Sequence, residues 1–307
     1  MSNMDPLTIK SVLVIGPSGN VGRSTIKALL DEKFDVTGLS RTSSQATLPS
    51  GVRHVKSDYS EASLREIFKG QDAVISTISS IVVGDALASQ KAIINAAIAA
   101  GVKVFFPSEY GIDTSDRSAS TYVPFLADKI EIMDYLKANE DKISWTALVT
   151  GSMFDWGLNI PGFGGWNLST HSATIFDGGN IPYEATNLDQ VGRGIAKCLK
   201  NPGLTRNQYV YVNSFTITQN EVLKALEKNM KEGFTVSQGS VEQLWKEGAS
   251  QVKAGEPLGV LSMLSGAIYG KGNLAHFSST RGLWNDRLNL PQESLGEFLG
   301  EYLAKNV

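Results

Sequence analysis

The first half of the chain alternates short apolar runs with amphipathic segments. The runs are rich in Val, Ile and Phe and end at glycine or polar residues, which is typical of buried strands. We expect strands at residues 11–15, 35–40, 52–56, 73–78, 102–106 and 144–149. We expect helices at residues 23–32, 62–68, 85–100 and 124–139, the third of them capped by Asp85. Alternating strands and helices build a sheet that is covered on both faces, so the pattern predicts an α/β fold with a doubly wound parallel sheet.

The pattern changes after residue 149. Residues 151–169 are rich in glycine and aromatic side chains and follow neither a helical nor a strand period. Beyond them we expect a helix at residues 189–200, a strand at residues 208–212 and a helix that begins with the capping-box motif Thr218-Gln-Asn-Glu221. The sequence thus predicts a sheet domain in residues 1–155 and a smaller, mainly helical region in residues 156–307. The two are partly interleaved, because the later strand can rejoin the first sheet.

A glycine-rich turn follows the first apolar strand and opens the first helix. Its three glycines have the spacing G-x-x-G-x-x-G, which allows a tight turn, close approach of the backbone to a pyrophosphate, and close packing of helix on strand. The start of the helix adds free N–H groups and a partial positive charge. We therefore expect a Rossmann dinucleotide site, the alternative being an ordinary turn between strand and helix. The expected cofactor-binding residues of the turn are Gly16, Ser18, Gly19, Asn20, Val21 and Gly22.

The end of the second strand selects the dinucleotide. An NAD site carries an acidic residue there, about 20 residues after the turn, but this chain has Arg41. A guanidinium group can bind the 2′-phosphate of NADP(H) through paired hydrogen bonds, so we predict NADP(H) as the cofactor. Asp58 is expected either to accept a hydrogen bond from the adenine amino group or to cap the next turn. Thr77 and Ile78 end the fourth strand and are expected to contact the nicotinamide half.

Several motifs together resemble one family. They are the glycine turn at 16–22, Arg41, the Phe-Phe-Pro-Ser-Glu-Tyr-Gly motif at 105–111, Lys129, the turn at 151–154 and the segment at 187–192. Over residues 11–215 the chain resembles the isoflavone-reductase-like, NmrA-like branch of the atypical short-chain dehydrogenases/reductases. The resemblance implies either NADPH-dependent reduction in specialised metabolism, as in plant members that act on phenylpropanoid, lignan or isoflavonoid substrates, or cofactor sensing by a regulator. It also implies that Ser152 and Phe154 bind the cofactor.

Lys129 is the candidate catalytic residue. Common short-chain dehydrogenases use Tyr-x-x-x-Lys, but no tyrosine of this chain has a lysine four residues on. The resemblance implies that Lys129 bonds the nicotinamide ribose and assists proton transfer, since a lysine in apolar surroundings has a lowered pKa and can act as acid or base. A role in anchoring the ribose alone stays open. The chain departs from plant members, which carry a basic run after this lysine, because Glu131 and Asp134 follow it here.

Candidate substrate contacts fall in two places. Ser108, Glu109 and Tyr110 follow the fifth strand, where open α/β sheets bind ligands, and Tyr122 precedes the lysine helix. Either tyrosine can be an auxiliary proton donor or purely structural. The aromatic segment at 151–169 can wall a pocket for a flat, apolar substrate or form a local hydrophobic cluster. Its candidate residues are Met153, Trp156, Phe163 and Trp166, beside Phe154.

Composition narrows the class of protein. The 307 residues carry a net charge of −3, and 42% of them are hydrophobic, so we expect a folded chain without the basic surface that nucleic acid requires. No apolar run approaches the about 20 residues of a membrane span, and no signal pattern opens the chain, so we expect a cytoplasmic protein. The one cysteine, Cys198, is expected in the core, and the three histidines have no metal-ligand spacing. We expect a small-molecule substrate as the partner and leave a homodimer open.

Three functions fit these residues. The first is an NADPH-dependent reductase of an aromatic or polyketide-like small molecule, in which residues 1–155 bind NADP(H) and residues 156–307 bind substrate. The second is a non-catalytic, NADP(H)-sensing regulator that binds a protein partner. The absence of Tyr-x-x-x-Lys supports it, whereas Lys129 argues against it. The third uses the same pocket for a non-redox isomerisation or cyclisation. The glycine turn, Arg41 and Lys129 together favour the reductase.

Overall fold

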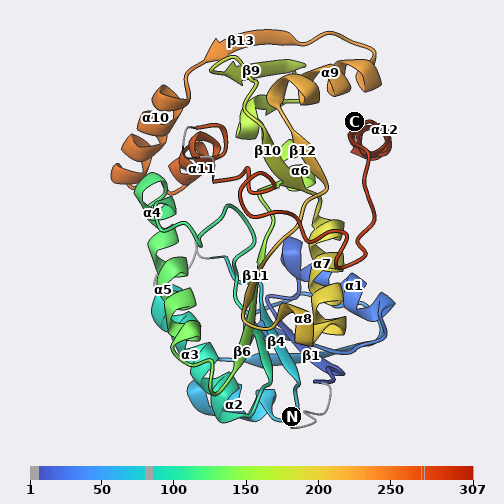
Figure 1. Cartoon of the computed structure of the whole chain (residues 1–307), viewed down its shortest axis with the longest axis vertical. Helices are drawn as coiled ribbons and strands as arrows, with labels where there is room; N and C mark the ends of the chain where they lie inside the picture. The colour runs from blue at the N-terminus through green and yellow to red at the C-terminus, as the bar shows by residue number, and fades with distance from the viewer. Residues whose placement is uncertain (1–6, 80–85, 271, 273, 307) are drawn as a thin grey trace.

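The computed structural model describes residues 7–79, 86–270, 272 and 274–306, so the expected N-cap Asp85 lies outside the described residues. Within them, the largest sheet has seven strands, all parallel (Figure 1). The strands are β1 (Ser11–Ile15), β2 (Asp35–Arg41), β3 (Val52–Ser57), β4 (Ala73–Ser76), β5 (Val104–Phe106), β6 (Ser144–Val149) and β11 (Gln208–Tyr211). Their spatial order is β11-β6-β5-β4-β1-β2-β3. The chain therefore winds outward from β1 in both directions, which confirms the doubly wound α/β fold.

Successive residues of the central strands face opposite layers of helices. One layer consists of α1 (Asn20–Asp31) and α7 (Leu188–Lys200), and the other of α2 (Glu61–Phe68), α3 (Ala86–Ala99) and α5 (Leu126–Lys137). Val12 of β1 packs in the first layer and Leu13 in the second, and both side chains are fully buried. A parallel strand that is buried on both faces has a continuous apolar sequence. The apolar runs of β1, β4 and β6 are therefore visible in the sequence alone.

Two elements beyond residue 155 belong to the large sheet. β11 pairs with β6 at the edge of the sheet, and α7 packs on α1 before it leads into the short helix α8 (Pro202–Thr205). A Cβ on Gly192 of α7 would lie 2.2 Å from the backbone oxygen of Ser24 in α1, so only glycine permits this close helix crossing. The chain thus returns to the first domain, whereas the functional division at residue 155 stays a prediction.

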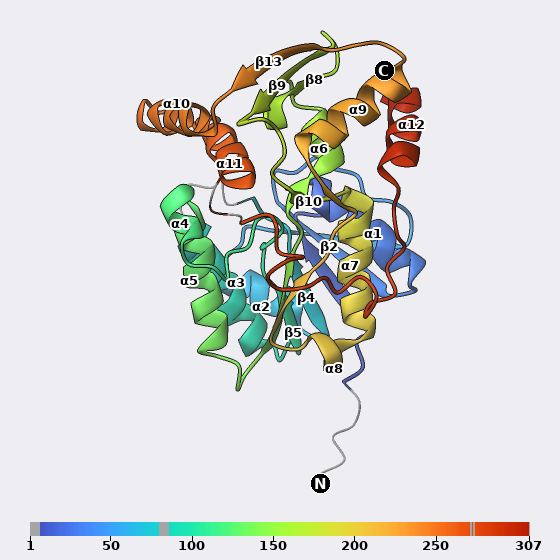
Figure 2. The same cartoon turned by 45° about the horizontal axis from the view of Figure 1, so that its top comes forward.

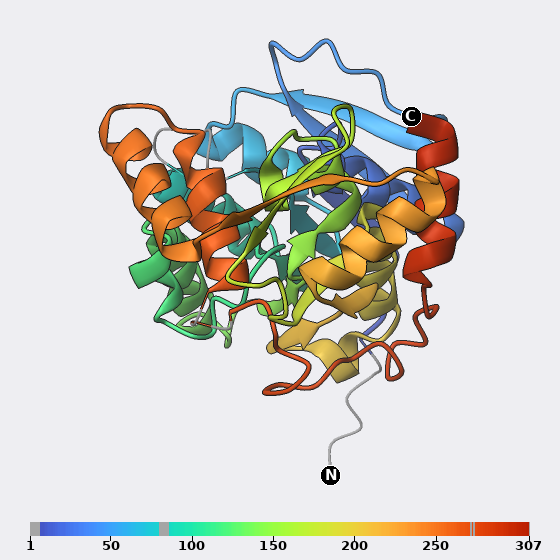
Figure 3. The ribbon, with the colours of Figure 1, turned by 90° about the horizontal axis from the view of Figure 1, so that it is seen from above.

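Most of the rest of the chain lies beyond the carboxyl ends of the large sheet (Figures 1 and 2), whereas Phe277, Trp284, Leu288 and Leu290 pack in the core layer of α1 and α7. In the described part of the chain it contains two three-stranded sheets as well as helices. The first sheet is β12 (Phe215–Ile217), β10 (Tyr183–Thr186) and β7 (Ser152–Met153), and the second is β13 (Thr235–Gly239), β9 (Ser172–Phe176) and β8 (Trp166–Asn167). The helices are α4 (Ala119–Tyr122), α6 (Phe154–Leu158), α9 (Gln219–Met230), α10 (Val241–Lys253), α11 (Gly259–Tyr269) and α12 (Leu295–Asn306), with a 3-10 turn at Phe163–Gly165. Seen from above, α10 and α11 lie on one side of the small sheets and α9 and α12 on the other (Figure 3). The sequence predicts a mainly helical region here, and the structure adds these two small sheets, which were not expected.

Two local predictions are confirmed. Thr218 caps α9, since its Oγ1 accepts a hydrogen bond from the backbone N–H of Glu221 (3.2 Å) and the Glu221 carboxylate accepts one from the backbone N–H of Thr218 (2.8 Å). Cys198 is buried in α7, and burial raises the pKa of its thiol. The thiol is therefore the unreactive core residue that the sequence predicts. Among the described residues, no helix is both long and apolar enough to cross a membrane.

Candidate active site

The glycine turn joins three strands of the large sheet. The backbone N–H of Gly16 donates to Leu39 O of β2 (3.2 Å), and the Thr77 hydroxyl at the end of β4 donates to Ile15 O (2.7 Å). Gly16 has a positive φ of 80°, and a Cβ there would lie 2.9 Å from Thr77 Oγ1. Only glycine suits this position, because it combines the left-handed backbone with the lack of space. The turn therefore lies beside Thr77, the residue expected at the nicotinamide half.

The start of α1 leaves its first backbone N–H groups for a ligand. Gly19 is the N-cap and supplies no side-chain hydrogen bond, and the first turn of α1 contains no acidic residue. The N–H groups of Asn20, Val21 and Gly22 have no acceptor within the helix, and they lie at the positive end of the helix dipole. A Cβ on Gly22 would lie 2.2 Å from Gly16 O, so the helix approaches the turn as closely as the backbone allows. This cradle fits a pyrophosphate group.

Arg41 lies at the exposed end of β2. None of the ion pairs among the described residues includes it, so its guanidinium group is available to an anion. Arg41 is also close enough to Tyr59 to oppose the effect of burial, which raises the pKa of that phenol to about 12. A separate cavity opens beside the turn, between Ser18, Leu48 and Arg23 of α1. Arg23 is a second cation near the turn, and no motif in the sequence marks it.

Asp58 stabilises a local turn. Its carboxylate accepts hydrogen bonds from the backbone N–H (2.9 Å) and the hydroxyl (2.7 Å) of Ser60, and the bond from the backbone N–H is the main reason that its pKa is lowered. Ser60 in turn caps α2 by accepting from Ser63 N. Asp58 was expected either to cap this turn or to bind adenine, and its hydrogen bonds in the structure are those of the cap. An adenine contact stays a prediction.

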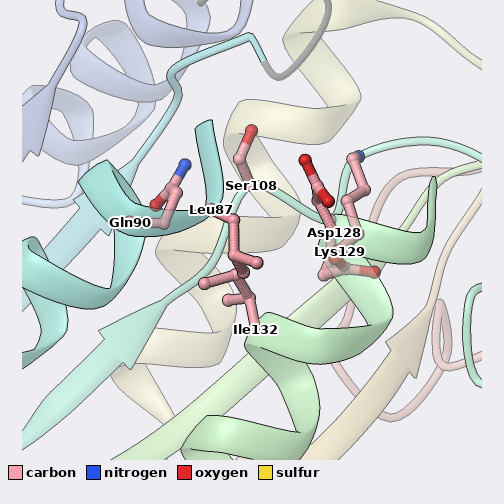
Figure 4. A pocket seen from close by; sticks show the side chains of 7 residues that line it. Leu87, Gln90, Ser108, Asp128, Lys129 and Ile132 are labelled. Atoms are coloured by element: carbon pink, nitrogen blue, oxygen red, sulfur yellow. The ribbon is translucent and has the colours of Figure 1, made fainter. Parts of the chain in front are cut away.

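A pocket with Lys129 on its wall lies at the end of β5, between α3 and α5 (Figure 4). Its lining consists of Leu87, Gln90, Ser108, Glu109, Asp128, Lys129 and Ile132. In the close view, the side chains of Ser108 and Lys129 extend in the same direction (Figure 4). Gln90 projects from α3, and its Oε1 accepts a hydrogen bond from the Ser76 hydroxyl (3.2 Å). Three of the predicted site residues, Ser108, Glu109 and Lys129, are therefore brought together by the fold.

Glu109 and Lys129 affect each other's protonation. Glu109 is 1% exposed and accepts a hydrogen bond from the Thr114 hydroxyl. Burial raises the pKa of the Glu109 carboxyl, and burial lowers the pKa of the half-buried Lys129 amine. The charge of each group opposes the effect of burial on the other. The result is a lysine that gives up its proton more readily than one in water, which is the property that a proton donor near neutral pH requires.

The two candidate tyrosines lie away from this pocket. Tyr110 is buried in the core on the α1 and α7 side of the sheet, and its hydroxyl has no hydrogen-bond partner among the described residues. Tyr122 packs against Gly272, and its backbone oxygen accepts from Trp245 Nε1 (2.6 Å). Neither tyrosine lines the pocket that contains Lys129. Their roles as auxiliary proton donors stay predictions without support from this arrangement.

The aromatic segment forms a packed cluster. Phe154 and Trp166 are buried in the core of the smaller region, and Trp156 packs edge-on against Phe163 with ring centroids 5.3 Å apart. Met153 is partly buried against the sheet domain, and Ser152 and Met153 form the short strand β7. The segment was expected either to wall a substrate pocket or to form a local hydrophobic cluster, and its packing in the structure is that of a cluster. Ile78, the last of the expected cofactor contacts, is partly buried against the layer of α2, α3 and α5.

Sequence reasoning missed five residues of the site, one of which is Asp128, the residue before Lys129. Leu87 and Gln90 come from α3, and Ile132 lies one helical turn after Lys129, so it faces the same side of α5. Its spacing from Lys129 is the signal that could have found it. Thr114 binds Glu109 from a polar loop, and nothing in the sequence distinguishes it from the serines around it.

Comparison with known proteins assigns the family. The profile of the NmrA-like family matches residues 8–258. The chain belongs to the NmrA-like family. One relative is the oxidoreductase aprR of Aspergillus flavus. Its sequence is 34% identical to this chain over 97% of this chain and 99% of its own length.

Solved structures show the same fold. A crystal structure of isoflavone reductase has a TM-score of 0.76 at 21% identity and covers 96% of this chain and 100% of its own. The complex of leucoanthocyanidin reductase with NADPH from Vitis vinifera has a TM-score of 0.76 at 20% identity, with coverage of 96% and 99%. The resemblance expected from the motifs is thus confirmed for the family and for the fold. The individual site residues stay predictions.

Proposed function

We propose that this member of the NmrA-like family is an NADPH-dependent reductase of a small aromatic or polyketide-like molecule. The observation that carries the proposal is the position of Lys129 on a pocket wall at the end of β5, with the glycine cradle at the end of β1 in the same sheet. The ends of neighbouring parallel strands are where open α/β sheets bind ligands. The oxidoreductase name of the Aspergillus flavus relative supports this class of reaction.

The cofactor-binding residues have separate tasks in this proposal. The N–H groups at the start of α1 hold the pyrophosphate, and Arg41 binds the 2′-phosphate. Thr77 and Ile78 border the nicotinamide half, together with Ser152 and Phe154 beyond β6. Bound NADPH supplies the hydride. The complex of leucoanthocyanidin reductase with NADPH, which has the same fold, supports the choice of cofactor.

Lys129 supplies the proton in this proposal. A reduced substrate must gain one proton for each hydride, and the ammonium group of Lys129 can give it to a heteroatom or carbon that lies in the pocket. The amine left behind then regains a proton from water. Burial lowers the pKa of Lys129, which makes the transfer easier. The same ammonium group can bond the ribose, so positioning and proton donation are compatible.

The pocket favours a substrate with a polar reacting group on an apolar frame. Ser108 and Gln90 offer hydrogen bonds, whereas Leu87 and Ile132 offer apolar contact. The names of isoflavone reductase and leucoanthocyanidin reductase, two proteins with this fold, refer to aromatic substrates. The proposal includes a cytoplasmic protein that acts on small molecules rather than nucleic acid, and it leaves a homodimer open.

The test combines nucleotide binding with turnover. Calorimetry should give tighter binding of NADPH than of NADH, and a screen of aromatic and polyketide-like carbonyl or ether compounds should reveal NADPH oxidation. Lys129→Met should lower kcat by about 10²- to 10⁴-fold. Lys137→Met, an exposed lysine on the same helix, is the matched control and should change kcat little. Weak, equal binding of both nucleotides would contradict the proposal. NADPH binding without turnover of any compound would favour a sensor.

A further inference from the structure

Glu109 is a buried carboxyl group with a single neutral donor. Its side chain is 1% exposed, and the Thr114 hydroxyl is the hydrogen-bond donor recorded for its carboxylate among the described residues. No arginine or lysine lies within ion-pair distance of it in the described part of the chain, although it lines the same pocket as Lys129. A buried carboxylate is costly unless nearby positive charge compensates it. The arrangement therefore requires an explanation that packing alone does not give.

Lys129 supplies most of the compensating charge. The charged and titratable groups around Glu109 are Lys129 and Lys137 of α5, Asp113 of its own loop, its chain neighbour Tyr110, and Tyr209 of β11. Lys129 has the largest effect of these on Glu109, larger than those of Asp113 and Lys137. Conversely, the negative charge of Glu109 favours the ammonium form of Lys129 and so opposes the effect of burial. The two groups thus oppose each other's burial on one pocket wall, to which Asp128 adds a second carboxylate.

We propose that Glu109 is a positioning residue that keeps Lys129 protonated in this desolvated pocket and thereby sets the upper pH limit of proton donation. The inference rests on the proposed reductase function only for its second half. Burial alone disfavours the ammonium form of Lys129, and the negative charge of Glu109 restores it. Thr114 assists by donating to the carboxylate, which favours the charged form of Glu109. The free protein then carries its proton on Lys129 before substrate arrives.

Glu109→Gln tests the effect of the negative charge of Glu109 separately from the effect of its shape. Glutamine has the same shape and can accept the hydrogen bond of Thr114, but it carries no charge. The pKa of Lys129 should therefore fall, by about one pH unit or more for a charge removed at this range in a partly buried site. The pKa falls rather than rises because the ammonium form of Lys129 loses the negative charge of Glu109 and therefore releases its proton at lower pH. In turnover, the decline of kcat/KM on the alkaline side should move to lower pH by the same amount.

Glu131→Gln is the matched control. It removes the same charge from α5 two residues after Lys129, but Glu131 is exposed and pairs with Lys91 (2.5 Å) on the outside of the molecule. The Lys129 titration should therefore be unchanged in this variant. Thr114→Val is a second probe, because it weakens the charged form of Glu109 without altering a titratable group, and it should lower the pKa of Lys129 by less than Glu109→Gln does.

The decisive measurement is an NMR titration of the intact, free protein labelled with ¹³C at the lysine ε-carbon. The Lys129 signal is identified by its loss in Lys129→Arg. A lower titration midpoint in Glu109→Gln, with the Glu131→Gln midpoint unchanged, is the expected result. An unchanged or higher midpoint in Glu109→Gln overturns the proposal. If Glu109→Gln fails to fold, the Thr114→Val midpoint decides in the same way.

The measurement is independent of the reductase proposal. It needs no cofactor and no substrate, so a failed substrate screen leaves the result on the pair intact. Where a substrate is found, the alkaline decline of kcat/KM must move together with the NMR midpoint. A shifted midpoint with an unmoved pH profile overturns the claim that Glu109 sets the pH limit. A purely structural role for Glu109 would lower activity equally at all pH values, which is a different result.

Discussion

Gly22→Ala is the sharpest test of the glycine cradle. Gly22 lies in the first turn of α1, and its backbone has an ordinary helical conformation that alanine also adopts. The substitution therefore changes only the space around one methyl group. That methyl group would lie 2.2 Å from Gly16 O and 3.0 Å from the backbone carbon of Pro17. Both neighbours are backbone atoms of the turn, so no side chain can rotate away to make room.

The size of the effect follows from the overlap. Ordinary contact of a Cβ begins at 3.4 Å, so α1 and the turn must separate by about 1 Å, a shift for which overpacked cores lose roughly 1–3 kcal/mol. For a chain of this size, each kcal/mol lowers Tm by about 2–4 °C. The separation also moves the N–H groups of α1 away from the turn. NADPH should therefore bind at least about 10-fold more weakly, which corresponds to about 1.4 kcal/mol.

Gly19→Ala separates the two effects. A methyl group at Gly19 would meet Gly16 O at 3.4 Å, which is ordinary contact, and the φ of −71° suits alanine. Its Tm should stay within a few degrees of the wild type, so any loss of NADPH affinity in this variant reports on the ligand. Thermal unfolding and NADPH calorimetry on both variants are sufficient. A Gly22→Ala protein with wild-type Tm and wild-type NADPH affinity would refute the reasoning about the close approach.

Two further predictions concern charge. Arg41→Asp should reverse the preference for NADPH over NADH, and an unchanged NADPH Kd in calorimetry would show that Arg41 does not bind the 2′-phosphate. Burial raises the pKa of Asp155 from 3.8 to about 6, so its contribution to stability is complete below about pH 4 and is lost as pH rises through 6. Asp155→Asn, which can still accept from Leu188 N, should stabilise the protein at pH 8 by about 1–2 kcal/mol after allowance for partial exposure, and by nothing at pH 4. A stability difference in urea that is equal at both pH values would contradict this.

The large sheet could be predicted because its information is local. The central strands β1, β4, β5 and β6 are runs of mostly apolar residues that are buried on both faces, and helices follow β1, β3, β4 and β5. Pattern alone therefore indicates these strands and their parallel direction. The expected and observed bounds of β1 agree at residues 11–15. The turn after β1 could also be predicted, because glycines at 16, 19 and 22 between a strand and a helix permit a tight turn and a close approach of the helix.

The strands of the smaller region were harder to predict from the sequence, for a physical reason. β7 and β8 are two residues long, which is too short for a period of two to be visible. β9 and β13 pair in parallel although the paired residues are 63 positions apart in the sequence, and most of β13 is exposed. Their pairing depends on contacts between distant segments rather than on a local preference. Tertiary context, which composition does not record, therefore decides the structure of this region.

The candidate site could likewise be predicted only in part. Lys129 and the loop that follows β5 carry motifs, so both were identified from the sequence. Their chemistry, however, depends on the approach of α5 to that loop and on Thr114, which reaches Glu109 from five residues away. The walls of the pocket that the structure describes come from residues 87–132, all on the side of α2, α3 and α5. The proposed proton donor, Lys129, and the surfaces that border it therefore belong to the sheet domain, whereas the aromatic segment at 151–169 packs in the core of the smaller region. Under the proposed function, changes in substrate preference should consequently be sought first along α3 and α5, where an altered side chain lies next to Lys129.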